Sequence, residues 1–163
     1  NNPGAFAIGD TIYTGQKLIY SPIPSFSPEL FARLRNPNTS LAKKFQKGIA
    51  QLEEEGAVQI LHPQKGGGSQ EPILAAVGEL QFEVAQYRLK TEYGVETRLE
   101  TLPYTSARSV NAGWDALLKG ENLYETAVFQ DRWQRPVLLF RSQWHLERVE
   151  ERRSELKLSS VGN

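Results

Sequence analysis

The side chains that most often serve as nucleophiles, general bases or metal ligands are scarce in this chain of 163 residues, which has no cysteine and two histidines. The lack of cysteine excludes disulfides, thiolate metal sites and cysteine nucleophiles. His62 and His145 lie far apart, with no recurring metal-ligand spacing. We interpret His62 as the end of a strand beside Pro63 and His145 as part of a charged helix face. A catalytic histidine stays open as the alternative.

Two other runs could bind ions but lack the surroundings that such sites require. A phosphate-binding loop leads into the N-terminus of a helix, whereas the run Gly66-Gly67-Gly68-Ser69 is followed by a predicted strand. We interpret this run as a flexible connector. Glu53, Glu54 and Glu55 are adjacent on a predicted helix and point in three directions, which favours solvated acids over a cation site. A stand-alone hydrolase remains an alternative, but it lacks a credible pair of nucleophile and base.

The most informative charged residues form a basic cluster within a chain that is neutral overall. Lysine plus arginine and aspartate plus glutamate each number 19, so only a local patch can attract RNA or a membrane. No acid lies between Leu30 and Leu52. We expect a positive face that contacts RNA phosphate, with a face that only aids solubility as the alternative. The candidate contact residues are Arg33, Arg35, Lys43, Lys44 and Lys47, with Lys65, near the tip of the glycine loop, as a further contact.

Composition also bounds the setting of the chain. No run approaches the roughly 18 apolar residues of a membrane span, and the absence of cysteine fits a reducing compartment. We therefore expect a soluble, cytoplasmic protein. The chain begins Asn-Asn-Pro-Gly and contains no methionine, and we expect it to be part of a longer polypeptide.

The elements that must position these residues are clearest between Pro72 and Leu102. The apolar run 73–77 predicts a buried strand, Gly78 ends it, and residues 79–93 have helical periodicity up to Gly94. Alternation over 95–100 predicts a strand with one solvated face. The helix is apolar on two sides, so we expect its second side to be covered by the C-terminal tail or a partner, or to stay partly wet. One side holds Leu80, Val84 and Tyr87, and the other Phe82, Ala85, Leu89 and Tyr93.

The flanking segments extend this unit in both directions. Ser27-Pro28-Glu29 has the pattern of a helix start, with Leu30, Phe31 and Leu34 as the apolar face. A second amphipathic helix is predicted from Leu41 to Gly56, and a strand over 57–61. In the tail we predict a strand at 104–110, a helix at 114–119, a hairpin of 124–130 with 137–141, a helix at 143–153 and a last strand at Leu156 and Leu158. No internal repeat is visible.

With a strand at 17–20, the predicted order is strand, helix, strand, strand, helix, strand. We therefore expect an α+β fold, a ferredoxin-like (split βαβ) antiparallel sheet with helices on one face and inner strands at 17–20 and 72–77. Residues 1–16 are interpreted as a remnant of a β-barrel domain with its linker. Residues 17–163 form the C-terminal α+β domain, with a core at 17–102 and an extension at 103–163.

Several segments together resemble a known family. They are Gly9-Asp10-Thr11, Phe26-Ser-Pro-Glu-Leu-Phe31, the segment 45–59 (FQKGIAQLEEEGAVQ), Ala76-Val-Gly-Glu-Leu-Gln-Phe82 and the segment 86–96 (QYRLKTEYGVE). This set resembles the C-terminal part of the release factor 3 family of bacterial translational GTPases, which are related to elongation factor G. The first segment is similar to the end of the family's second, β-barrel domain. Residues 126–136 depart from the family pattern and look like an added hairpin.

The resemblance implies a role in translation termination. The full-length factor is expected to use GTP to promote dissociation of class I release factors from the ribosome after peptide release. This chain would dock on the ribosome, mainly on small-subunit rRNA and protein, and would contact its own GTPase domain. GTP and Mg²⁺ would bind in the N-terminal domain, so we expect no cofactor and no catalytic activity in this chain, and a monomer without membrane contact. The alternatives are a ferredoxin-like regulatory domain for a small ligand, or the corresponding fragment of another translational GTPase.

Overall fold

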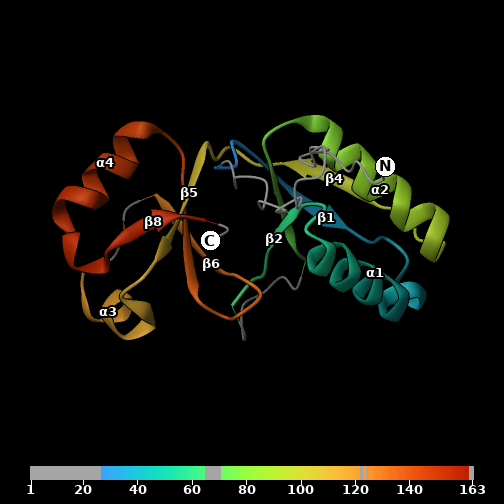
Figure 1. Cartoon of the computed structure of the whole chain (residues 1–163), viewed down its shortest axis with the longest axis horizontal. Coiled ribbons are helices and arrows are strands. Elements are labelled where there is room, and N and C mark those ends of the chain that lie inside the picture. Colours follow the sequence, from blue (N-terminus) through green and yellow to red (C-terminus); the bar gives the residue numbers. More distant parts are fainter. Residues whose placement is uncertain (1–26, 65–70, 122, 124, 162–163) are drawn as a thin grey trace, which may run out of the picture.

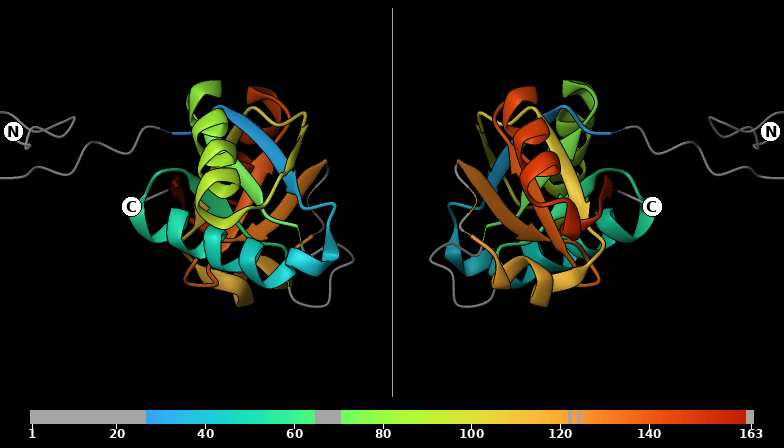
Figure 2. Two further views of the ribbon diagram at one scale, coloured as in Figure 1. Left: turned by 90° about the vertical axis from the view of Figure 1, so that its right-hand side faces the viewer. Right: turned by 90° about the vertical axis from the view of Figure 1, so that its left-hand side faces the viewer.

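In the computed structural model, which describes residues 27–64, 71–121, 123 and 125–161, the first half of the chain forms one antiparallel sheet covered by two helices. The strand order is β2-β3-β1-β4 (Figure 1). Both helices lie on the same face of this sheet (Figure 2). The elements are β1 (Leu30–Arg35), a 3-10 turn (Thr39–Leu41), α1 (Ala42–Glu55), β2 (Gln59–Leu61), β3 (Ile73–Ala76), α2 (Glu79–Tyr93) and β4 (Arg98–Thr101).

The second half repeats this path although the sequence shows no repeat. Its strands pair antiparallel in the order β6-β7-β5-β8, so each strand takes the place of its counterpart four strands earlier. The two halves share the path of the chain but not its residues, since corresponding strands such as β3 (ILAA) and β7 (PVLLF) differ in sequence. The elements are β5 (Ser106–Val110), α3 (Gly113–Lys119), β6 (Thr126–Gln130), β7 (Pro136–Phe140), α4 (Gln143–Arg152), a 3-10 turn (Ser154–Leu156) and β8 (Leu158–Ser160).

The two sheets pack face to face, and each carries its helices on the outside, which gives four layers (Figure 1). Successive side chains of a strand point to opposite faces. In β3, Ile73 therefore faces the second sheet while Leu74 faces α1 and α2. In β7, Val137 and Leu138 divide in the same way. Burial on both faces explains why both strands are continuous apolar runs.

The structure contradicts the helix that was predicted for residues 27–35. Leu30–Arg35 is strand β1, which pairs with β3 on one side and β4 on the other. The serine, proline and acid before it satisfy the local pattern of a helix start, but alternate side chains of β1 enter two different cores. Phe31 enters the core between the two sheets, and Leu34 enters the core between the first sheet and its helices. The gain from burying both faces outweighs the local preference. The inner strands are thus β1 and β3, and the predicted strand at 17–20 lies outside the described residues.

One expectation was that the tail covers the second side of α2, and the structure contradicts this. The tail packs instead on the opposite face of the first sheet, through the layer between the two sheets. Phe82, Ala85 and Leu89 of α2 are buried against the first sheet. Leu80 and Tyr87, on the other side of the helix, are 70% and 68% exposed. This second side therefore stays open to solvent in the described part of the chain.

Glycines end both helices of the first half, and another allows the helices to approach each other. Gly56 and Gly94 follow α1 and α2 with φ of +72° and +70°, a left-handed conformation that stops a helix. Within α1, Gly48 faces α2, where an added Cβ would lie 2.5 Å from Leu89 Cδ2. The contact between α1 and α2 therefore depends on the missing side chain at Gly48.

We expect Gly48→Ala to lower the free energy of unfolding by about 1–3 kcal/mol, because Leu89 is buried and must shift. Alanine is otherwise the better helix former by about 1 kcal/mol, so the sign of the change separates packing from propensity. Urea unfolding of the two proteins measures it. Ala50→Gly, at an exposed position of the same helix, calibrates the propensity, and a stabilised Gly48→Ala protein would show that the helices can move apart.

Arg88 joins the two helices on their outer surface. Its guanidinium lies 2.5 Å from Glu55 of α1 and 2.8 Å from Glu92, one turn further along α2. Hydrogen bonds from Arg88 and then from Gln51 lower the pKa of Glu55 from 4.5 to about 2. The pKa of Glu92 is lowered by the same arginine. The ion pairs thus favour the charged carboxylates of the folded state.

A carboxyl group whose pKa is lower in the folded state stabilises the fold above its unfolded pKa, and this stabilisation is lost as the pH falls through the folded value. For Glu55 the window runs from about 4.5 down to about 2. We therefore expect Glu55→Gln to lower the melting temperature at pH 7 and to make it less dependent on pH within that window. Thermal unfolding across this range measures the effect. Glu54→Gln is the matched control, and equal pH profiles for the wild type and Glu55→Gln would exclude a net contribution from the ion pair.

Candidate functional site

Two of the predicted contact residues lie away from the others. Arg33 and Arg35 are on β1, not on a helix, and they alternate with residues that face α1 and α2, so they share the opposite face of the sheet with Phe31. Arg33 Nη1 lies 3.3 Å from Glu100 Oε1, and Arg35 Nε lies 3.1 Å from Glu71 Oε2. The expected single basic face of five residues is therefore wrong, and these two arginines belong to a network of ion pairs. Lys65 lies outside the described residues.

The three remaining lysines do form a group. Lys43, Lys44 and Lys47 are exposed and share one side of the first turns of α1, opposite the buried Phe45 and Ile49. Within the described ranges, no ion pair joins these lysines to an acid. The first turn of α1 contains no acid, and the positive end of a helix dipole disfavours cations. Lys43 and Lys44 therefore sit where they cost helix stability, which favours a binding role, and Lys47 lies one turn further along the helix.

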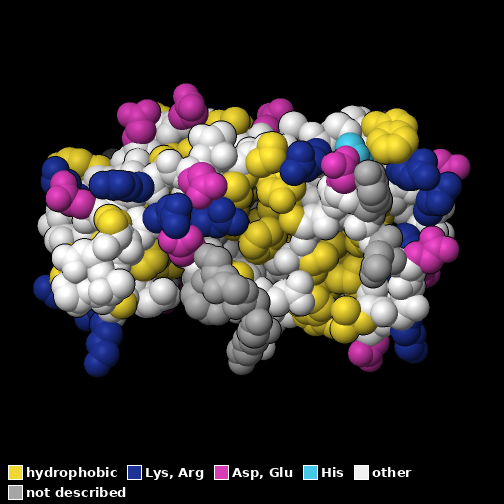
Figure 3. Space-filling model, turned by 180° about the vertical axis from the view of Figure 1, so that it is seen from behind, with side chains coloured by type: hydrophobic (Ala, Val, Ile, Leu, Met, Phe, Trp, Pro, Cys, Tyr) yellow, Lys and Arg dark blue, Asp and Glu magenta, His cyan; other side chains and the backbone are white. Residues whose placement is uncertain are grey.

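A second group of cationic side chains lies on α4 and was missed by the sequence analysis. Trp144, Arg148 and Arg152 follow each other at intervals of four residues, so they lie on one side of the helix. The Arg148 guanidinium lies 5.0 Å from the centroid of the Trp144 ring. Figure 3 shows basic and acidic side chains together at the end of the molecule where α4 lies. The signal was the spacing of four, which the interleaved glutamates of the same helix obscured.

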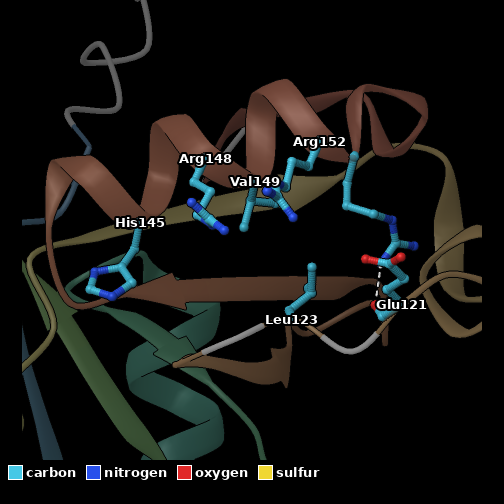
Figure 4. Close-up of a pocket in the computed structure, with 7 residues that line it drawn as sticks. Glu121, Leu123, His145, Arg148, Val149 and Arg152 are labelled. Carbon is cyan, nitrogen blue, oxygen red and sulfur yellow. Dashed lines mark hydrogen bonds between the residues drawn. The ribbon is translucent and has the colours of Figure 1, made fainter.

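A pocket of about 110 Å³ lies beneath this side of α4. Arg148 and Arg152 extend from the helix above Leu123, with His145 at one end and Glu121 at the other (Figure 4). His145 is held at both ring nitrogens, with Nδ1 2.7 Å from Ser142 Oγ and Nε2 3.0 Å from Glu125 Oε2. The histidine therefore fixes the start of α4 and the adjoining loop.

Arg153 forms the buried wall of this pocket. Its guanidinium donates to the main-chain oxygens of Glu121 at 2.8 Å, Ala116 at 3.0 Å and Leu117 at 3.2 Å, and its Nε donates to Glu155 at 2.6 Å. Ala116 and Leu117 belong to the last turns of α3. The carbonyls there have no partner within the helix, and a cation that donates hydrogen bonds to them also complements the negative end of the helix dipole. Arg153 thus joins the end of α4 to the end of α3, and its role is structural.

The other histidine has a comparable setting. His62 Nε2 lies 2.9 Å from Glu53 Oε2 of α1, while the main chain of His62 pairs with Gln130 of the second sheet. Glu53, Glu54 and Glu55 point in different directions as predicted, since Glu53 meets His62, Glu54 is exposed and Glu55 meets Arg88. In the residues that the structure describes, no cluster of three His, Asp or Glu side chains could hold a metal ion. Of the helices described, none has the length and apolar character needed to cross a bilayer.

Comparison with known protein families identifies the class to which this two-sheet body belongs. The model of the family "Class II release factor RF3, C-terminal domain" matches residues 20–150, most of the chain. The chain therefore belongs to the C-terminal domain family of class II release factors.

Three relatives with high identity are each described as peptide chain release factor 3. The protein of Synechocystis sp. is 60% identical over 161 residues, which cover 99% of this chain and 29% of the relative. Those of Trichormus variabilis and Nostoc punctiforme are each 59% identical over 99% of this chain and 30% of their own length. The chain thus spans less than a third of the length of these relatives.

The contact between Arg153 and Gly120 can be tested directly. A Cβ on Gly120 would lie 2.2 Å from Arg153 Cζ, so we expect Gly120→Ala to displace the guanidinium and leave carbonyls of α3 unpaired. The expected loss of unfolding free energy is about 1–3 kcal/mol. Arg153→Met should lose a similar amount, and the double variant should lose less than the sum, because both changes remove the same interaction. Additive losses in a denaturant titration would contradict this coupling.

Proposed function

We propose that this chain is the ribosome-docking part of a peptide chain release factor 3. The observation that carries the proposal is its membership of the family, with 60% identity over 99% of its length to a protein of that name. The parent factor would use GTP to promote dissociation of class I release factors from the ribosome after peptide release. The GTP and Mg²⁺ site would lie in the rest of the parent, since no nucleotide-binding motif occurs in these 163 residues. The chain itself would have no enzymatic activity.

The architecture supports a mechanical role. Two sheets that share one apolar layer form a body whose halves move together, and such a body can transmit a change of orientation. A ligand shifts an equilibrium only by the difference between its affinities for the two states. We therefore infer that the chain binds one state of the ribosome better than the other, and that this difference favours departure of the class I factor.

The finer description of the fold and setting is also a proposal. The path strand, helix, strand, strand, helix, strand and the order β2-β3-β1-β4 support a ferredoxin-like (split βαβ) assignment for the first half. We retain residues 1–16 as the end of a β-barrel domain and residues 17–163 as the C-terminal α+β domain, divided near residue 102. The factor would act in the cytoplasm as a monomer, away from membranes, and this chain would contact its own GTPase domain.

The three lysines of α1 are the residues we assign to the ribosome contact, mainly with small-subunit rRNA and protein. They are exposed, they are not paired with acids in the described ranges, and two of them, Lys43 and Lys44, lie in the first turn, where the helix dipole disfavours cations. The alternative of a regulatory domain for a small ligand is not favoured. Four of the pockets on the described surface hold about 110–270 Å³, below the roughly 300–1,000 Å³ of typical ligand sites.

The lysine contact can be tested by charge reversal in the full-length factor. If Lys43, Lys44 and Lys47 each meet an rRNA phosphate, the triple change to glutamate should weaken ribosome binding. It should also reduce the slope of log K against log salt by about 2.7, if each contact counts roughly 0.9 as it does on a B-form duplex. Ribosome pelleting at several salt concentrations measures both quantities.

Lys119→Glu is the matched control, because Lys119 is exposed and lies on α3 in the other half of the chain. A triple variant that keeps the wild-type salt slope would remove the α1 lysines from the interface. A wild-type factor that does not bind ribosomes at any salt concentration would refute the docking role itself.

A further inference from the structure

The exposed side of α4 has a composition that the α1 contact does not explain. We name Trp144, Arg148 and Arg152 the α4 strip. At 100° per residue these side chains fall within a sector of about 80°, and Glu151 and Glu147 lie about 20° and 60° beyond its Trp144 edge. Leu146 and Val149 lie on the far side, where they are buried against the second sheet. The helix therefore has a core side and an exposed side, on which the α4 strip is bordered by Glu151 and Glu147.

Five of the eleven arginines form an ion pair with an acid in the described residues, and the two arginines of the α4 strip are among the other six. The five are Arg33, Arg35, Arg88, Arg135 and Arg153. In the described residues no such pair holds Arg148 or Arg152, although Glu147 and Glu151 are close along the helix. Both guanidiniums overhang the small pocket beneath α4 (Figure 4). Their charge is thus available to an anionic partner.

Trp144 adds an aromatic surface beside these charges. The side chain is 57% exposed, and its ring carries one guanidinium, that of Arg148. Trp133 is similarly exposed but has two guanidiniums over its ring, at 4.8 and 5.1 Å, and one of them is already paired with Asp131. Trp114 is tied down by a hydrogen bond from Nε1 to the oxygen of Gln134. Of the three tryptophans, Trp144 has the ring best placed to stack with a planar group of a partner.

The α4 strip is also held rigidly. Ser142 caps the helix and accepts a hydrogen bond from the His145 amide at 3.3 Å, and the imidazole next to Trp144 is fixed between Ser142 and Glu125. Arg153 ties the other end of the helix to α3. A binding surface that is already ordered loses less conformational entropy when the partner arrives.

From these observations we propose that the α4 strip binds a short single-stranded segment of RNA. One unstacked base would stack on Trp144, and phosphates of neighbouring nucleotides would meet Arg148 and Arg152, which are about 6 Å apart along the helix axis. An exposed aromatic ring beside unpaired cations is the combination by which proteins bind single strands. The inference rests on the proposed function in one respect, namely that the RNA is taken to be ribosomal. An acidic protein segment would use the two charges but would leave Trp144 without a stacking partner.

The test measures binding of the full-length factor to a fluorescein-labelled oligouridylate by anisotropy. We expect Trp144→Ala to weaken binding between about fivefold and 150-fold, the range for one stacked base, while Trp144→Phe keeps most of the affinity. Arg148→Glu with Arg152→Glu should reduce the salt slope by about 1.4, at roughly 0.7 per phosphate of a single strand. Trp133→Ala and Lys119→Glu are the matched controls and should bind as the wild type does. Melting curves establish that each variant is folded.

The outcomes separate this inference from the proposed function. The role of the α4 strip would be overturned if the Trp144 and arginine variants kept the wild-type affinity and salt slope, or if Trp133→Ala lost as much affinity as Trp144→Ala. This holds even if the α1 lysine variant no longer binds ribosomes. The α4 strip would be assigned to an acidic protein instead if oligoglutamate displaced the RNA from the wild type and Trp144→Ala bound the RNA with wild-type affinity. If the factor does not bind ribosomes but binds oligouridylate through Trp144, the docking role fails and the α4 strip stands.

Discussion

The apolar layer between the two sheets is the contact on which the rest of the molecule depends. Phe31, Ile73, Val137 and Leu139 are within 1% of complete burial in this layer, and each comes from a strand whose other face contacts a helix pair. Removing one sheet would expose an entire face of the other, at a cost of roughly 25 cal/mol for each Å² of apolar surface. The main-chain bridge of His62 with Gln130 continues this contact at the sheet edges. Neither half is therefore expected to be stable alone, and both must move as one unit.

The parts of the fold that the sequence predicted are those whose pattern is determined locally. Strand β3, helix α2 between its glycines, and the hairpin of β6 and β7 follow from apolar runs, helical periodicity and turn residues. The helix predicted at 27–35 failed because its start signals are local while the pairing of β1 with β3 and β4 joins distant residues. The face on which the tail packs was misassigned for the same reason. Periodicity shows that α2 is apolar on two sides but not which side is covered.

For the candidate contact residues, too, local sequence patterns could be interpreted but contacts between distant residues could not. Charge along the sequence grouped Arg33 and Arg35 with the lysines of α1, whereas their acidic partners Glu71 and Glu100 are distant in the sequence and adjacent in space. Ion pairs of this kind are set by strand register, which no local pattern contains. The α4 strip is the opposite case. Its spacing was visible, but net charge over the helix concealed it, because a helix separates residues by angle rather than by position.

The α1 lysines and α4 lie at opposite ends of the four-layer body (Figure 1). A rigid object held at one point can still pivot about it, whereas attachment at two separated points fixes its orientation. Once one end is bound, the other is presented to its site at a high effective concentration, so two individually weak contacts act together. Such a body would report the angle of whatever holds it, and a small rotation of its support would break one attachment before the other.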